Sequence, residues 1–121
     1  MEIKGVRERL QVQDADLPES HFSNVQLSNA QFVNTALQDT SFTDANLSNA
    51  TFCGVRLSSA RFEDAALQGA SFTDVNLSNA TFTNVNLSHV AITDANLAGM
   101  TINGVLVSEL FRAYEQRQGD R

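Results

Sequence analysis

Large apolar residues recur at every fifth position of the chain, without a break in phase, from Leu17 to Val107. The residue two places before each of these centres is usually small, and the residue two places after it is usually Asn, Asp or Gly. A period of five matches neither the 3.6-residue period of a helix nor the two-residue alternation of a strand. The chain must therefore turn once in every five residues. The 19 centres are Leu17, Phe22, Leu27, Phe32, Leu37, Phe42, Leu47, Phe52, Leu57, Phe62, Leu67, Phe72, Leu77, Phe82, Leu87, Ile92, Leu97, Ile102 and Val107.

The pattern predicts an all-β coil. A centre and the small residue two places before it lie on the same side of a short extended segment, so both are expected to point inward. The Asn, Asp and Gly residues that follow are the types that accept tight-turn geometry or bond their own backbone. A chain built in this way winds so that each coil pairs its backbone with the coils above and below.

The repeated segments resemble the pentapeptide-repeat family, whose consensus is A(D/N)LXX. Ala45-Asn46-Leu47-Ser48-Asn49 and Ala95-Asn96-Leu97-Ala98-Gly99 match it directly, and the resemblance spans about residues 13–107. It implies a right-handed, four-sided parallel β-helix in which four repeat units make one coil. Two opposite faces would then carry Phe centres and the other two Leu centres. Nearly five coils, spaced by about 4.8 Å, would make a rod roughly 23 Å long.

The two ends of the repeat are expected to carry caps, at residues 1–12 and 108–121. At the N-terminus, Ile3, Val6 and Leu10 fit a helix, whereas Val6, Leu10 and Val12 fit an added strand, and both alternatives stay open. At the C-terminus, apolar residues recur at helical spacing from Val107, and Ser108 is a suitable N-cap residue. We expect a helix from about 108 to 117 that covers the last coil. The stripe consists of Val107, Leu110, Phe111 and Tyr114.

The apolar band on this C-terminal segment is wide for a helix that buries a single stripe. Exposed apolar clusters commonly mark interfaces, and two-fold dimers are the most common way to close one. The sequence therefore predicts a homodimer joined through the C-terminal ends, with Leu110, Phe111 and Tyr114 in the interface. Gyrase-binding members of the family that the chain resembles also dimerise at this end.

Residues that could carry catalysis or bind a metal do not come together in the predicted coil. His21 and His89 lie 68 positions apart in the sequence, so about 3.4 coils, or roughly 16 Å, separate them along the axis. Cys53 and His89 are separated by about 1.8 coils, or roughly 9 Å. The chain has no Gly-rich phosphate loop, paired-Cys motif or nucleophile elbow. We expect no enzymatic activity, no cofactor and no metal site.

Carboxylates at equivalent positions of successive coils are expected to stack on the corners. Asp44 stacks with Asp64, and Asp74 with Asp94, which forms a candidate acidic interaction surface. Such a pair could hold a cation, but solvated turn residues are the favoured interpretation. The only basic residues in the repeats, Arg56 and Arg61, are expected to form ion pairs with Glu63 or Asp64.

The net charge of −6 and the pI near 4.6 argue against direct binding to nucleic acid, which relies on clustered Lys and Arg. A single cysteine, Cys53, suits a reducing compartment. Residues 1–12 show no apolar run of signal-peptide length, and no segment is long and apolar enough to span a membrane. We therefore expect a cytoplasmic protein without membrane contact.

The favoured function is a non-enzymatic scaffold or protein–protein interaction module whose partner the sequence does not identify. The alternative comes from the resemblance, because some family members imitate duplex DNA in shape and charge, bind DNA gyrase and give quinolone resistance. A 23 Å length of duplex would carry roughly 14 negative charges. Residues 13–108 contain nine acidic and two basic residues, a net charge of −7, which is about half that density.

Overall fold

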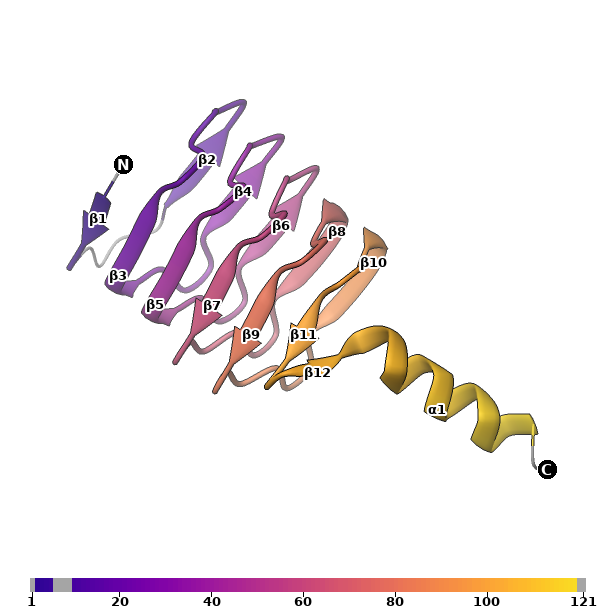
Figure 1. Cartoon of the computed structure of the whole chain (residues 1–121). Helices are drawn as coiled ribbons and strands as arrows, with labels where there is room; N and C mark the ends of the chain where they lie inside the picture. Colours follow the sequence, from indigo (N-terminus) through magenta and orange to yellow (C-terminus); the bar gives the residue numbers. More distant parts are fainter. Residues whose placement is uncertain (1, 6–9, 120–121) are drawn as a thin grey trace.

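The computed structural model describes residues 2–5 and 10–119. The part before the C-terminal helix winds into a right-handed, four-sided parallel β-helix of about five turns. A helix follows the last coil, as Figure 1 shows. The elements are β1 (Glu2–Lys4), β2 (Gln11–Gln13), β3 (His21–Gln26), β4 (Gln31–Val33), β5 (Ser41–Asn46), β6 (Thr51–Cys53), β7 (Arg61–Glu63), β8 (Ser71–Asn76), β9 (Thr81–Thr83), β10 (Ala91–Asn96), β11 (Thr101–Ile102), β12 (Val105–Leu106) and α1 (Val107–Gly119).

The strands form two sheets, and the chain passes from one sheet to the other and back in every coil. The seven-stranded sheet has the order β1-β3-β5-β7-β9-β11-β12, and the five-stranded sheet has the order β10-β8-β6-β4-β2. Phe42 pairs with both Phe22 and Phe62, and Phe52 pairs with both Phe32 and Phe72. This register, in which every fourth centre pairs, confirms the predicted coil. The sheets are the two Phe faces.

Two Leu faces join the sheets, and isolated parallel bridges hold them together. We call first Leu face the side with Leu27, Leu47, Leu67 and Leu87, where Asn46 bridges to Ala66 and Ala66 to Asn86. We call second Leu face the side with Leu17, Leu37, Leu57, Leu77 and Leu97, where Ala36 bridges to Arg56 and Arg56 to Asn76.

Stacked phenylalanines fill the core between the two sheets. Within the seven-stranded sheet, the ring centroids of Phe42 and Phe62 are 4.9 Å apart and their planes differ by 5°. Across the core, Phe42 meets Phe52 edge to face, with centroids 6.4 Å apart and an angle of 88°. Both arrangements are favourable for aromatic quadrupoles. From Phe22 to Phe82, each of the seven rings is at most 1% exposed, so the predicted inward positions are confirmed.

The corners of the coil lie two residues after each centre and have left-handed backbone geometry. Non-glycine residues at these corners have φ between 50° and 65°, a region that Asn and Asp tolerate better than other residues. Glu19 and Ser59 occupy the same position, although their side chains favour it less. Asn residues just before the Leu centres add local bonds: Asn46 Oδ1, for example, accepts a hydrogen bond from the Ser48 backbone N–H at 3.0 Å.

The described part of the N-terminal segment continues the two sheets as strands. In β2, Val12 pairs with Phe32, so the repeat phase already begins at Val12 rather than at Leu17. In β1, Ile3 pairs with Phe22, which lies 19 positions later in the sequence rather than 20. Of the two alternatives for residues 1–12, the strand agrees with the structure at these positions. Val6, which both alternatives used, lies outside the described residues.

The C-terminal helix differs from its prediction in placement rather than in existence. The coil ends in a hairpin, because Asn103 (φ 48°) and Gly104 (φ 79°) reverse the chain and β12 pairs antiparallel with β11. Positive φ at both turn residues is the signature of a type I′ turn. α1 then starts directly at Val107 and extends away from the coils (Figure 1). The expectation that the helix covers the last coil is therefore wrong.

Candidate interaction surfaces

The C-terminal end of the core is only partly covered. In the fourth coil, Leu67, Phe72 and Leu77 are at most 1% exposed. In the last coil, the residues at the equivalent positions, Leu87, Ile92 and Leu97, are only partly buried. No further coil lies beyond them among the described residues. We call this surface the open end, and it consists of Leu87, Val90, Ile92, Ala95, Leu97 and Ile102.

The predicted interface residues Leu110, Phe111 and Tyr114 lie together on α1 and face solvent. Their exposed fractions are 49%, 54% and 62%, whereas Val107, the first residue of the same stripe, is 7% exposed. Val107 anchors the helix, because its N–H donates to the Met100 carbonyl at 3.0 Å. Among the described strands, α1 packs substantially only against β12. We call Leu110, Phe111 and Tyr114 the helix stripe.

The acidic residues Asp44, Asp64, Asp74 and Asp94 all lie on corners and are exposed. Asp44 and Asp64 follow the paired residues Thr43 and Glu63, so they share a corner as expected. Asp64 Oδ1 accepts a hydrogen bond from Asn84 Nδ2 at 2.5 Å, one coil further on. This carboxylate is therefore hydrogen-bonded to an amide on the same corner, which agrees with the interpretation of these aspartates as solvated turn residues.

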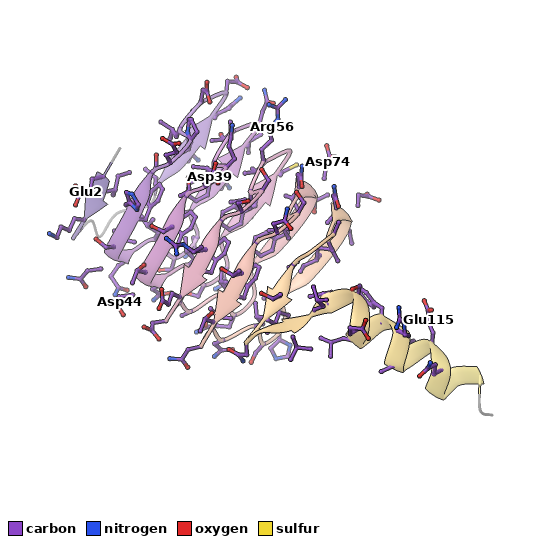
Figure 2. The ribbon with its side chains drawn as sticks, in the orientation of Figure 1. Glu2, Asp39, Asp44, Arg56, Asp74 and Glu115 are labelled. Carbon is purple, nitrogen blue, oxygen red and sulfur yellow. The ribbon has the colours of Figure 1, made fainter. Side chains whose placement is uncertain are left out.

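Asp74 and Asp94 share the opposite corner, because the residues on both sides of them pair: Thr73 with Thr93 and Val75 with Ala95. Gly54 interrupts the same corner one coil earlier and leaves a shallow hollow of about 460 Å³. Arg56 and Asp74 lie along this edge of the rod, whereas Asp44 lies on the other side (Figure 2). The hollow is open to solvent, and polar backbone and side-chain groups line most of it.

The expected ion pairs of Arg56 and Arg61 are absent from the described part of the chain. There, Glu109 and Arg112 on α1 form the one ion pair, at 3.5 Å between exposed groups. Arg61 lies between Ser41 and Thr81 in the sheet, and Arg56 lies between Ala36 and Asn76. The register between successive coils therefore gives both arginines neutral cross-strand neighbours.

Charge is confined to one half of the rod. The nine acidic and two basic residues of segment 13–108 lie on the seven-stranded sheet, on the second Leu face and on the corners that border them. We call the rest the uncharged half. Between Gln26 and Thr93, it comprises the first Leu face, the five-stranded sheet and the corner that joins them. The residues of that corner are Asn29, Asn49, Gly69 and His89. Its outward residues include no Asp, Glu, Lys or Arg.

The three side chains considered for chemistry remain apart. His21 Nδ1 lies 2.7 Å from Ser41 Oγ, Cys53 is an exposed free thiol, and His89 is a corner residue with φ of 60°. Within residues 2–5 and 10–119, no group of three His, Cys, Asp or Glu side chains could hold a metal ion. None of the helices formed by the described residues is both long and apolar enough to cross a membrane.

Sequence reasoning missed the hairpin that positions the helix stripe. Asn103-Gly104 is the strongest short-range hairpin signal, but both residues also fit the repeat, in which Gly104 occupies a corner position. The hairpin signal was therefore present in the sequence, but it was interpreted as one more repeat unit.

Comparison with known proteins agrees with this architecture. A family model for the pentapeptide repeat region matches residues 8–81 and 37–110. A pentapeptide repeat protein from the thylakoid lumen of Arabidopsis thaliana superposes with a TM-score of 0.63 at 24% identity, covering 91% of this chain and 74% of that one. HetL, a pentapeptide repeat protein involved in heterocyst differentiation regulation in the cyanobacterium Nostoc, superposes with a TM-score of 0.56 at 24% identity.

The match to HetL covers 82% of this chain and 49% of HetL, so the chain spans about half of that protein's length. No curated protein sequence matches the chain significantly. Pentapeptide repeat proteins are generally structural or interaction modules. With a family match that runs through nearly all of the coils, and a strand register that agrees with it, the chain belongs to the pentapeptide repeat family.

Proposed function

We propose that the chain is a non-enzymatic protein-interaction module that works as a homodimer joined through its C-terminal end. The observation that carries the proposal is the helix stripe: Leu110, Phe111 and Tyr114 are about half exposed on a helix that leaves its own coil uncovered. The open end lies next to it and exposes further apolar surface. Contiguous apolar surface of this kind, left in contact with water, favours association.

A two-fold dimer is the simplest way to cover this surface, because each copy then offers the same patch to the other. The sides of the two rods remain free for a further protein partner. This arrangement needs no cofactor, metal, nucleic acid or membrane. A cytoplasmic location, inferred from the single Cys53, belongs to the same proposal.

Light scattering on the purified chain tests the dimer. We expect a mass of twice the 13.2 kDa of the chain at micromolar concentrations, and a return to monomer in Phe111→Arg and in Tyr114→Arg with unchanged circular dichroism. Gln116→Arg is the matched control, because it adds the same charge to the same helix away from the stripe and should leave the dimer intact. A wild-type mass of one chain would contradict the proposal.

The second candidate function is a DNA-mimicking modulator of DNA gyrase or topoisomerase. The observation that favours it is the confinement of all nine repeat carboxylates to one half of the rod, which concentrates their field on the side that a DNA-binding groove would meet. A supercoiling assay decides. Inhibition by the wild type that is lost in Asp44→Asn/Asp64→Asn, but kept in Ser48→Ala/Gln68→Ala on the uncharged half, supports mimicry. Absence of any effect at micromolar protein removes this candidate.

A further inference from the structure

The corner glycines of the rod differ in whether a side chain covers them. The Asn49 side chain lies over Gly69, so close that a Cβ there would collide with its amide oxygen, and Gly99 is covered in the same way. A Cβ at Gly54 would instead meet only backbone atoms of Asn34, at 3.7 Å or more. Gly54 is therefore an uncovered gap in a corner that otherwise carries Asn and Asp side chains.

Asn34 does not cover Gly54 because its side chain is turned the other way along the corner. Its Nδ2 donates a hydrogen bond to Asp14 Oδ1 at 2.7 Å, one coil nearer the N-terminus. The next side chain on the same corner, Asp74, lies one coil beyond Gly54. The corner is therefore open between Asn34 and Asp74, and the bond from Asn34 to Asp14 holds it open.

Hollows on both sides of the gap form a groove that runs along the rod. The hollow of about 460 Å³ extends from Gly54 to Asp94, and a second hollow of about 130 Å³ extends in the other direction to Ala15. Asn34, Gly54 and Arg56 line both of them. From Ala15 to Asp94 the groove crosses four coil spacings, or about 19 Å, which is enough for about six residues of extended chain. Its open, elongated shape fits a peptide segment better than a small molecule, which needs an enclosing pocket.

Charges of both signs lie along this groove in a fixed order. Arg56 lies at its centre, and its neighbours in the adjacent coils are the neutral residues Ala36 and Asn76. Asp74 and Asp94 follow one and two coils further on, or about 5 and 10 Å along the axis. Arg56 and Asp74 lie along the same edge of the rod (Figure 2). A segment of uniform charge is repelled at one of these positions, whereas a segment with one acidic and one basic side chain is attracted at both.

We propose that the groove at Gly54 binds an extended segment of a partner protein that carries an acidic and a basic residue two positions apart. Alternate side chains of an extended segment point the same way and are about 6.6 Å apart. The midpoint between Asp74 and Asp94 lies about 7 Å along the axis from Arg56. The acidic side chain then meets Arg56 while the basic one meets both aspartates. This inference rests on the proposed interaction module and names one of its surfaces, but it does not require the dimer.

An NMR titration of the isotope-labelled chain with synthetic peptides tests the groove. The probes are Thr-Glu-Thr-Lys-Thr and its reverse, Thr-Lys-Thr-Glu-Thr, with blocked ends, because threonine favours extended backbone. The matched controls are Thr-Lys-Thr-Lys-Thr and Thr-Gln-Thr-Gln-Thr. We expect saturable shifts of the backbone amides of Gly54, Arg56 and Asp74 with at least one of the two mixed peptides. The affinity of both controls should be weaker by about tenfold or more.

Two variants of the chain test the charge and the gap separately. Arg56→Glu reverses the central charge, so it should weaken the mixed peptide by about tenfold and strengthen the doubly basic one. Gly54→Asn fills the gap with a residue type that tolerates the φ of 65° and meets no close contact there. It should also weaken the mixed peptide by about tenfold. Ser59→Asn is the matched control, because it makes the same kind of change on another corner of the same coil and should bind as the wild type does.

The outcomes separate the groove from the proposed dimer, which light scattering tests on its own. Equal binding of the doubly basic peptide would show simple attraction to the net negative charge and would overturn the inference. Shifts confined to the uncharged half, or no shifts with either mixed peptide, would overturn it as well and leave the dimer standing. Circular dichroism shows whether each variant is folded, and if one variant does not fold, the other decides.

Discussion

At the scale of single residues, position in the coil decides what each side chain contributes. A phenylalanine in the middle of a sheet is held on four sides: Phe62 stacks on Phe42 and Phe82 at 4.9 and 4.6 Å and meets Phe52 and Phe72 edge to face. Removing it leaves a cavity that the stacked backbone cannot close, because the coils on both sides are fixed by their hydrogen bonds.

We expect Phe62→Ala to lower the free energy of unfolding by about 3–5 kcal/mol. Asn84→Ala serves as the comparison: it loses the exposed bond to Asp64 and places alanine at φ 52°, which together cost about 1–2 kcal/mol. Urea unfolding followed by circular dichroism measures both. Equal losses would contradict the assignment of inward and outward positions.

Two corner glycines offer a matched pair with different surroundings. Gly69 and Gly54 have φ of 73° and 65°, so alanine is strained at either position by about 1–2 kcal/mol. A Cβ at Gly69 would also collide with Asn49 Oδ1, whereas a Cβ at Gly54 meets only ordinary contacts of 3.7 Å or more. We therefore expect Gly69→Ala to be the more destabilising change in thermal unfolding. In an Asn49→Ala background the two glycine changes should cost the same, and a difference that persisted would show that the collision is not its cause.

At the scale of elements, the repeat phase was sufficient to predict the coils and insufficient to predict how they end. The phase identifies the inward positions, because a shift of one residue would turn Phe42 or Phe52 away from the core, and the family resemblance supplied the four units per coil. The stripe from Val107 to Tyr114 predicts a helix, but the same stripe suits a helix that lies on its own coil and one that lies on another chain. The prediction of an ion pair for Arg56 failed for a similar reason. Its neighbours in the structure, Ala36 and Asn76, lie one coil away and are not near it in sequence.

The hairpin should be a sensitive element, because it sets the direction of α1. A type I′ turn needs positive φ at both central residues, and a β-branched residue cannot adopt it without strain. We expect Gly104→Val to destabilise the hairpin by about 1–2 kcal/mol and to speed hydrogen exchange in residues 101–107 while the inner coils stay protected. Asn103→Gly keeps the turn geometry and should leave exchange of the hairpin much closer to wild type. Unchanged exchange in Gly104→Val would contradict the role of the turn.

At the scale of the whole molecule, the rod carries little charge at its open end, because Asp94 is the one charged residue between Val85 and Leu106. Each coil contacts only its neighbours, so an uncovered terminal coil is a local cost that the inner coils do not offset. The acidic corners Asp64 and Asp44 lie two and three coils from Ile102 at the open end, or roughly 10 and 14 Å along the axis, which equals or exceeds the Debye length of about 10 Å at 0.1 M salt. The proposed dimer therefore joins the two copies at an end where their mutual repulsion is weak.

This arrangement fixes the sign of the salt dependence of the dimer. Each chain carries a net charge of −6, so screening reduces the repulsion between copies, and salt does not weaken apolar burial. We expect the dimer to strengthen by less than about tenfold when NaCl rises from about 0.05 to 0.5 M, as measured by sedimentation equilibrium. Asp94→Asn, which removes the one charge of the last coil, should flatten the dependence further. A dimer that weakens with salt would mean that ion pairs between the chains hold it together, contrary to an apolar interface at the C-terminal end.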